Sequence, residues 1–201
     1  MVYKFSYPKH VKKALDIISI IGKRLNVLIW VSDSRSPYLT SKYIPELLNK
    51  IDYDRKLIVF VNKMDLVNDF DYGLFRNYLK QILKRDFTVL YGSYKNCKEL
   101  YNYLERLSNN ELFLNCLFVG LPNVGKSSII NCLVNKKKTE VSVLPGTTRN
   151  LKWISLRYNI KILDSPGVVL PFQITQEELV ELLELKIINR SFISAPNNKF
   201  L

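Results

Sequence analysis

Two hydrophobic periodicities alternate along the chain. Over residues 11–21 apolar side chains recur at helical spacing, with basic residues on the other side, which predicts an amphipathic helix with a basic outer face. Four apolar runs of strand length follow, each bounded by a helical or turn-like stretch. They span residues 25–31, 56–61, 87–91 and 112–119. This alternation predicts an α/β fold, with a mostly parallel sheet and helices on both of its faces.

The last third of the chain changes this pattern. The strand-like residues 152–158 and 160–163 are separated only by Asn159, which predicts a hairpin and one antiparallel pair. Residues 173–189 return to helical periodicity, and the polar tail is expected to fray. We therefore expect one domain over residues 1–201, with a basic N-terminal helical region (1–24) and a flexible tail (190–201).

Composition and charge narrow the class of protein. Hydrophobic residues make up 47% of the chain and charged residues 24%, which is typical of a globular protein. The apolar runs are far shorter than the roughly 20 residues of a membrane helix, so no membrane span is expected. Thirty basic residues against 18 acidic residues give a net charge of +12, which favours a polyanion such as RNA. An acidic membrane surface would attract the same charge.

The cysteines and the single histidine exclude two other classes. Cys97, Cys116 and Cys132 are odd in number and contain no CxxC pair, and His10 is the only histidine. Neither a disulfide framework nor a Cys/His zinc site is expected, and a cytoplasmic location fits best.

A phosphate-binding motif follows the fourth apolar run. The residues are Gly120-Leu121-Pro122-Asn123-Val124-Gly125-Lys126-Ser127, and they lead through Ser128 into a helical run. This matches GxxxxGK[ST] between a strand and a helix, the context of a P-loop. Its backbone NH groups wrap phosphates, Lys126 reaches the outer phosphates and Ser127 ligates Mg²⁺.

A base-reading motif closes the second apolar run. In Asn62-Lys63-Met64-Asp65 the Asp65 carboxylate can accept hydrogen bonds from the ring NH and the exocyclic amine of guanine. Adenine does not offer this pair of donors, so the nucleotide is predicted to be GTP or GDP. Ser93, after the third run, is the candidate for a loop that backs the guanine carbonyl.

A third segment can sense the terminal phosphate. Asp164 ends a strand-like run, where it can hold Mg²⁺ through water, and Gly167 can offer its NH to the phosphate. Thr148, in a loop between the P-loop and this segment, can complete the Mg²⁺ shell.

The order of the motifs is unusual, because the base-reading motif precedes the P-loop. This order, with Asp33-Ser34-Arg35-Ser36-Pro37 after a strand and Tyr7-Pro8-Lys9-His10, resembles the circularly permuted GTPases of the ribosome-biogenesis GTPase A (YlqF-like) family. The resemblance implies a P-loop NTPase-like fold and a role in assembly of the large ribosomal subunit, with that subunit or its rRNA as partner. Family members usually carry a further C-terminal helical RNA-binding domain.

Catalysis is expected to depend on Lys126, Thr148 and His10. Val168 and Val169 occupy positions where many GTPases carry a water-orienting glutamine. His10 is the candidate general base, and the resemblance implies a role in hydrolysis for a histidine at this place. The resemblance also implies a potassium ion beside Asn123, which could supply positive charge near the phosphates.

Three functions remain open at this point. The first is a GTP-hydrolysing assembly factor that is slow unless the ribosome stimulates it. The second is a nucleotide-dependent RNA-binding or scaffold module with little hydrolysis. The third is the related permuted family that acts on the small subunit, but the chain has no room for that family's N-terminal barrel and no ligands for its zinc segment.

Overall fold

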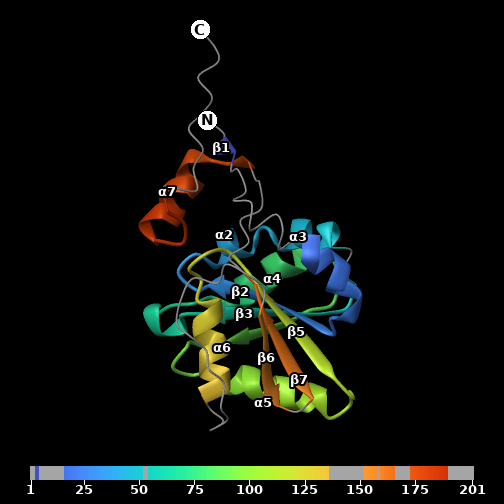
Figure 1. The fold of residues 1–201 in the computed structure, drawn as a ribbon. Helices are drawn as coiled ribbons and strands as arrows, with labels where there is room; N and C mark the ends of the chain where they lie inside the picture. The colour runs from blue at the N-terminus through green and yellow to red at the C-terminus, as the bar shows by residue number, and fades with distance from the viewer. Residues whose placement is uncertain are drawn as a thin grey trace.

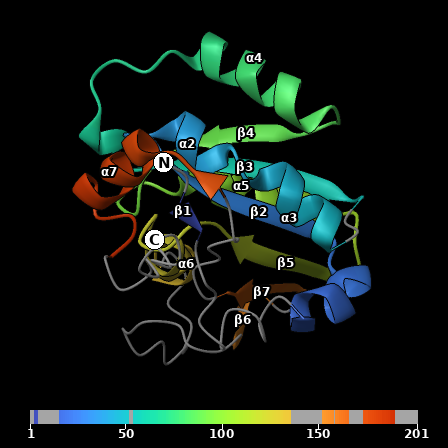
Figure 2. The same cartoon turned by 90° about the horizontal axis from the view of Figure 1, so that it is seen from above.

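A six-stranded sheet forms the centre of the molecule. The computed structural model describes residues 3–4, 16–51, 54–135, 152–157, 159–165 and 173–189. The strands are β2 (Val27–Asp33), β3 (Lys56–Asn62), β4 (Thr88–Tyr91), β5 (Leu114–Val119), β6 (Lys152–Arg157) and β7 (Ile160–Asp164). Their order in the sheet is β4-β3-β2-β5-β7-β6, as Figure 2 shows. Only β6 runs antiparallel, to β7, so the predicted hairpin and mixed sheet are confirmed.

Helices cover both faces of the sheet. They are α2 (Pro37–Ser41), α3 (Ile44–Lys50), α4 (Tyr72–Leu83), α5 (Lys98–Ser108) and α6 (Lys126–Asn135), with short 3₁₀ turns η1 (Gly22–Arg24) and η2 (Met64–Leu66). Residues 16–21 are also helical. In Figure 1, α2, α3 and α4 lie above the strands and α5 and α6 lie below them. The predicted fold class is therefore confirmed.

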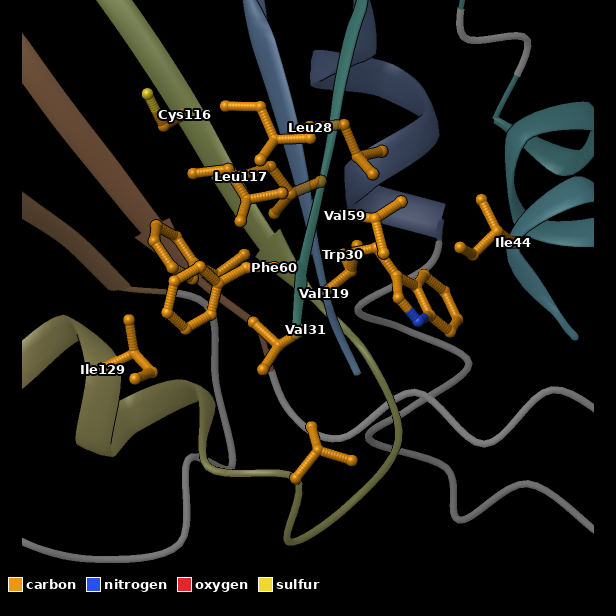
Figure 3. Packing of buried hydrophobic residues seen from close by; sticks show 14 of the residues in the cluster. Leu28, Trp30, Val31, Ile44, Val59, Phe60, Cys116, Leu117, Val119 and Ile129 are labelled. Atoms are coloured by element: carbon orange, nitrogen blue, oxygen red, sulfur yellow. The ribbon is translucent and has the colours of Figure 1, made fainter. Parts of the chain in front are cut away.

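Burial of both sheet faces explains the continuous apolar runs. Every residue of β2 is buried, including Trp30, which is 0% exposed. In Figure 3, Trp30 points toward Ile44 of α3, whereas Phe60 of β3 points toward Ile129 of α6. Consecutive strand residues face opposite sides, so a strand with helices on both faces is apolar throughout. The core thus sits in two layers, one on each side of the sheet.

The C-terminal helix is shorter than its periodicity predicts. We expected a helix over residues 173–189, but Gln173–Ile174 form strand β8, which pairs antiparallel with β1 (Tyr3–Lys4). Helix α7 spans Gln176–Glu184. Thr175 is its N-cap, and the Thr175 side chain forms a capping box with Glu178. The prediction was wrong at both ends. Pairing with β1 and this cap set the helix start, and Lys186, in a left-handed conformation with φ 55°, follows the helix end.

A disulfide joins the two helices below the sheet. Cys97, directly before α5, is bonded to Cys132 of α6, with Cα atoms 6.4 Å apart. The expectation of no disulfide was wrong, because 35 residues separate the two cysteines and only helix packing brings them together. Cys116 is free and buried.

Candidate nucleotide-binding site

The phosphate-binding motif forms a tight turn between β5 and α6. Gly120 and Gly125 have φ values of 148° and 96°, which L side chains rarely adopt. A Cβ on Gly120 would lie 2.5 Å from the Val31 carbonyl oxygen of the neighbouring strand β2. Asn123 is also left-handed, with φ 55°. The turn ends at Lys126, where α6 begins, and the first backbone NH groups of a helix have no partner within it.

Lys126 is buried inside this turn. Its side chain donates hydrogen bonds to the carbonyl oxygens of Gly120 and Leu121, at 3.2 and 2.9 Å. Burial lowers the pKa of Lys126 to about 8, although the nearby Asp164 carboxylate opposes this shift. A polyphosphate would give the ammonium group a stronger partner than two carbonyls.

The predicted Mg²⁺ ligands on the first turn of α6 and at the end of β7 are in contact. The Ser127 hydroxyl lies 3.0 Å from Asp164 Oδ2, and Asp164 is buried. A hydroxyl and a carboxylate are the hard oxygen ligands that Mg²⁺ prefers. The donor set of this pair therefore fits Mg²⁺.

The base-reading motif is bonded directly to the phosphate-binding turn. Asn62 is buried and donates from Nδ2 to the Val124 carbonyl at 2.7 Å. Lys63, in a left-handed conformation, donates to the Asn123 carbonyl at 3.0 Å. Asn62 Oδ1 is buried and has no hydrogen-bond partner in the described part of the chain. The two motifs thus form one surface that retains an unsatisfied acceptor.

Asp65 and Ser93 lie on adjoining loops. Asp65 accepts from Lys95 Nζ at 3.0 Å, and its side chain is 26% exposed. Ser93 is buried, its Oγ accepts from the Lys95 NH, and the neighbouring Gly92 carbonyl accepts from the Met64 NH at 3.1 Å. An ion pair this exposed is weak, so guanine can displace Lys95 from Asp65 at little cost.

Other predicted residues divide between the turn and the undescribed part of the chain. The Val124 side chain is fully buried, which leaves its backbone to face a ligand, and Ser128 is exposed on the first turn of α6. His10, Thr148 and Gly167 lie outside the described residues.

Asp33 organises this site in a way that the sequence motif alone did not reveal. This fully buried carboxylate accepts from Arg35 Nε and Nη2 at 2.9 and 2.7 Å and from Lys63 Nζ at 2.7 Å. Burial raises the pKa of Asp33, but the hydrogen bonds from Arg35 and Lys63 outweigh burial, so the pKa lies below its usual value. An aspartate at the end of a buried strand was the available signal.

The segment after α7 packs on the same network. Arg35 donates from Nη2 to the Leu185 carbonyl at 3.1 Å. Asn123 donates from Nδ2 to the Lys186 carbonyl at 3.0 Å. Lys42 also pairs with Glu178 of α7. The segment after α7 is therefore in direct contact with Asn123, the P-loop residue for which a potassium role was expected.

No group of three or more histidine, cysteine or acidic residues suited to a metal occurs within the described ranges. None of the helices in those ranges is long and apolar enough to cross a membrane.

Known proteins are similar to this chain in sequence. Residues 115–194 match the family model described as 50S ribosome-binding GTPase. The chain is 34% identical over 164 residues to Ribosome biogenesis GTPase A of Thermotoga maritima, covering 81% of this chain and 58% of that protein. The resemblance to the ribosome-biogenesis GTPase A family is confirmed. A probable ribosome biogenesis GTPase A of Mycoplasma genitalium is 33% identical over 170 residues, covering 82% of this chain and 60% of that protein.

A solved structure shares the permuted GTPase fold. The GDP-bound structure of TM YlqF superposes with a TM-score of 0.55 at 24% identity, covering 85% of this chain and 66% of that one. The chain spans less than two thirds of the length of the two GTPase A relatives.

Proposed function

We propose that this protein binds GTP and hydrolyses it to GDP and phosphate in the assembly of the large ribosomal subunit. The observation that carries the proposal is the direct bonding of the two nucleotide motifs, from Asn62 to Val124 and from Lys63 to Asn123. These bonds hold residues 62–65 beside residues 120–127, which supports the binding of one nucleotide by both segments.

In this proposal each motif has a separate task. Asp65 and Ser93 bind guanine, the turn around Gly125 and Lys126 binds the phosphates, and Gly167 senses the terminal phosphate. Ser127, Asp164 and Thr148 would hold Mg²⁺, whose positive charge offsets the charge of the phosphates. We propose that residues 1–201 form one GTPase domain.

Hydrolysis is proposed to be slow without a partner. Val168 cannot orient a water molecule through its side chain, which leaves this task to His10. Asn123 would help hold a potassium ion beside the phosphates. Val168 also favours a second candidate function, a nucleotide-dependent RNA-binding module with little hydrolysis. Phosphate release with and without ribosomal particles, in potassium and in sodium, distinguishes the two functions.

The proposed partner is the large ribosomal subunit or its rRNA, in the cytoplasm. The net charge of +12 suits phosphate neutralisation, and the matched family is described as 50S ribosome-binding.

Exchange of the base-reading carboxylate tests the proposed nucleotide. Asp65→Asn sets an amide NH₂ against a guanine donor, whereas the carbonyl of xanthine can accept from it. A buried polar mismatch costs about 1–3 kcal/mol, so we expect GTP to weaken and XTP to tighten by about ten- to a hundred-fold each. Asp69→Asn, a nearby exposed acid, is the matched control.

Competition binding of GTP, ATP and XTP measures both changes. If the parent protein does not prefer GTP to ATP, or if Asp65→Asn does not shift toward XTP, residues 62–65 do not read guanine and the proposed function fails.

A further inference from the structure

A cleft lies at the opposite end of the sheet strands from the candidate nucleotide site. It has a volume of about 750 Å³ and forms where β3 and β4 begin, between the α4–β4 turn and α5. Its lining residues are Asp54, Arg55, Lys56, Leu57, Arg85, Asp86, Phe87, Thr88 and Tyr103. Strand β3 is seven residues long, so this cleft lies about 20 Å from Asn62 at the other end of the strand. Both places can therefore be occupied at once.

Cations surround the cleft. Arg55, Lys56 and Arg85 line it. Lys84 precedes Arg85 in the α4–β4 turn, and Arg106 stacks over the Tyr103 ring with 5.8 Å between its guanidinium carbon and the ring centroid. The acidic lining residues are Asp54 and Asp86, so positive charge predominates. Charge of this kind attracts phosphate groups.

Aromatic side chains form an apolar part of the same cleft. Phe87 and Tyr103 line it, and both residues are half-buried. The Tyr103 hydroxyl lies 2.9 Å from Thr88 Oγ1, and this contact holds the ring against β4. Exposed aromatic faces beside arginines are the usual platform for unpaired bases.

Hydrogen bonding holds the cationic segments together before any ligand binds. Arg85 donates from Nη2 to the Arg55 carbonyl, which joins the segment before β3 to the segment before β4. The cleft is therefore built from adjoining strand ends, and the Arg85 side chain, already held by this bond, loses little freedom on binding.

We propose that this cleft binds a single-stranded RNA segment, with Arg55 and Arg85 on phosphates and an unpaired base against Phe87 and Tyr103. The combination of cations with an aromatic platform distinguishes this occupant from a lipid headgroup or an acidic peptide, which would use the cations alone. The inference rests on the proposed function for its partner, RNA, but it concerns a surface that GTP does not touch.

Binding of labelled RNA to the full chain tests the inference. The probes are a ten-nucleotide single-stranded oligouridylate and a duplex of equal length. Fluorescence anisotropy measures their binding at several salt concentrations. Arg55→Gln with Arg85→Gln should weaken single-strand binding at least about ten-fold. Loss of two phosphate contacts should also reduce the salt slope by about 1.4.

Two further variants separate charge from stacking. Arg24→Gln with Lys161→Gln removes the same charge from exposed residues that do not line the cleft, and should change neither quantity. Tyr103→Leu should weaken binding about ten-fold with an unchanged salt slope, because it removes a stacking face and no charge. Thermal melting checks that each variant is folded.

Several outcomes would overturn the inference. These are equal losses in the cleft and control variants, undiminished RNA binding by the cleft variant, duplex binding as tight as single-strand binding, or equal loss of binding to phosphatidylserine vesicles. GTP titration of the same samples separates the two proposals. If the parent protein binds GTP and the cleft variant retains its affinity for RNA and for GTP, only the cleft assignment fails. If the parent protein does not bind GTP but the cleft variant loses RNA binding, only the proposed function fails.

Discussion

Replacement of Asp33 by asparagine should destabilise the protein markedly. The carboxylate has no exposed surface and accepts side-chain hydrogen bonds from Arg35 and Lys63. In Asp33→Asn the oxygen that accepts from both cations, or the one that accepts from Arg35 Nε, becomes an NH₂ group that faces another donor. The negative charge that balances the two cations is also lost.

The burial of Asp33 and the exposure of its two partners set the expected loss in the free energy of unfolding. Loss of one partner from a buried ion pair costs about 3–5 kcal/mol, because the remaining charge is left uncompensated. Arg35 and Lys63 retain 25% and 20% exposure, so water can partly solvate them. We therefore expect the lower end, a loss of about 3 kcal/mol in the free energy of unfolding. With a urea m value of about 2 kcal/mol/M, the midpoint should fall by about 1.5 M.

Urea unfolding followed by circular dichroism measures this loss, with Asp69→Asn as an exposed control expected to change stability by less than about 0.5 kcal/mol. The pKa of Asp33 is lowered on folding, so its contribution is fully present above the unfolded pKa and is lost as pH falls through the lower folded pKa. The difference between parent and Asp33→Asn should therefore shrink below about pH 3.8, by up to about 1.4 kcal/mol per pH unit. An equal difference at pH 7 and pH 3, or a loss no larger than that of the control, would refute the reasoning.

Two further outcomes test the P-loop. Burial lowers the pKa of Lys126 to about 8, so GTP affinity measured by fluorescence titration should fall about ten-fold between pH 7 and pH 9. The fall should be smaller in Lys126→Arg, whose guanidinium stays charged. An equal fall in both proteins would show that Lys126 does not lose its proton over this pH range. Asn123→Ala removes the donor to the Lys186 carbonyl, so amide hydrogen exchange over residues 176–189 should accelerate several-fold without a comparable change in α5; unchanged exchange would show that this contact does not hold the segment.

The sequence alone predicted the features that are formed by residues close together in the chain. The turn from Gly120 to Ser127 was predicted because a strand, a glycine-rich turn and a helix start are contiguous, and the hairpin around Asn159 was predicted for the same reason. Continuous apolar runs indicated strands buried on both faces, since each run has a helix layer on either side. The ends of these strands were less accurate, because β2 spans Val27–Asp33 rather than 25–31.

Tertiary structure decided which of these local pieces meet. Asn62 contacts Val124 because the parallel strands β3 and β5 end at one edge of the sheet. Arg35 contacts Leu185, 150 positions away, because the segment after α7 packs against that edge. No periodicity carries that information, since side-chain spacing reports burial within an element and not the order of strands. The same limit applies to the Cys97–Cys132 bond, which depends on the start of α5 lying beside α6. Residues 173–174 became a strand because a distant segment paired with them, and pairing between distant segments outweighs a local helical pattern.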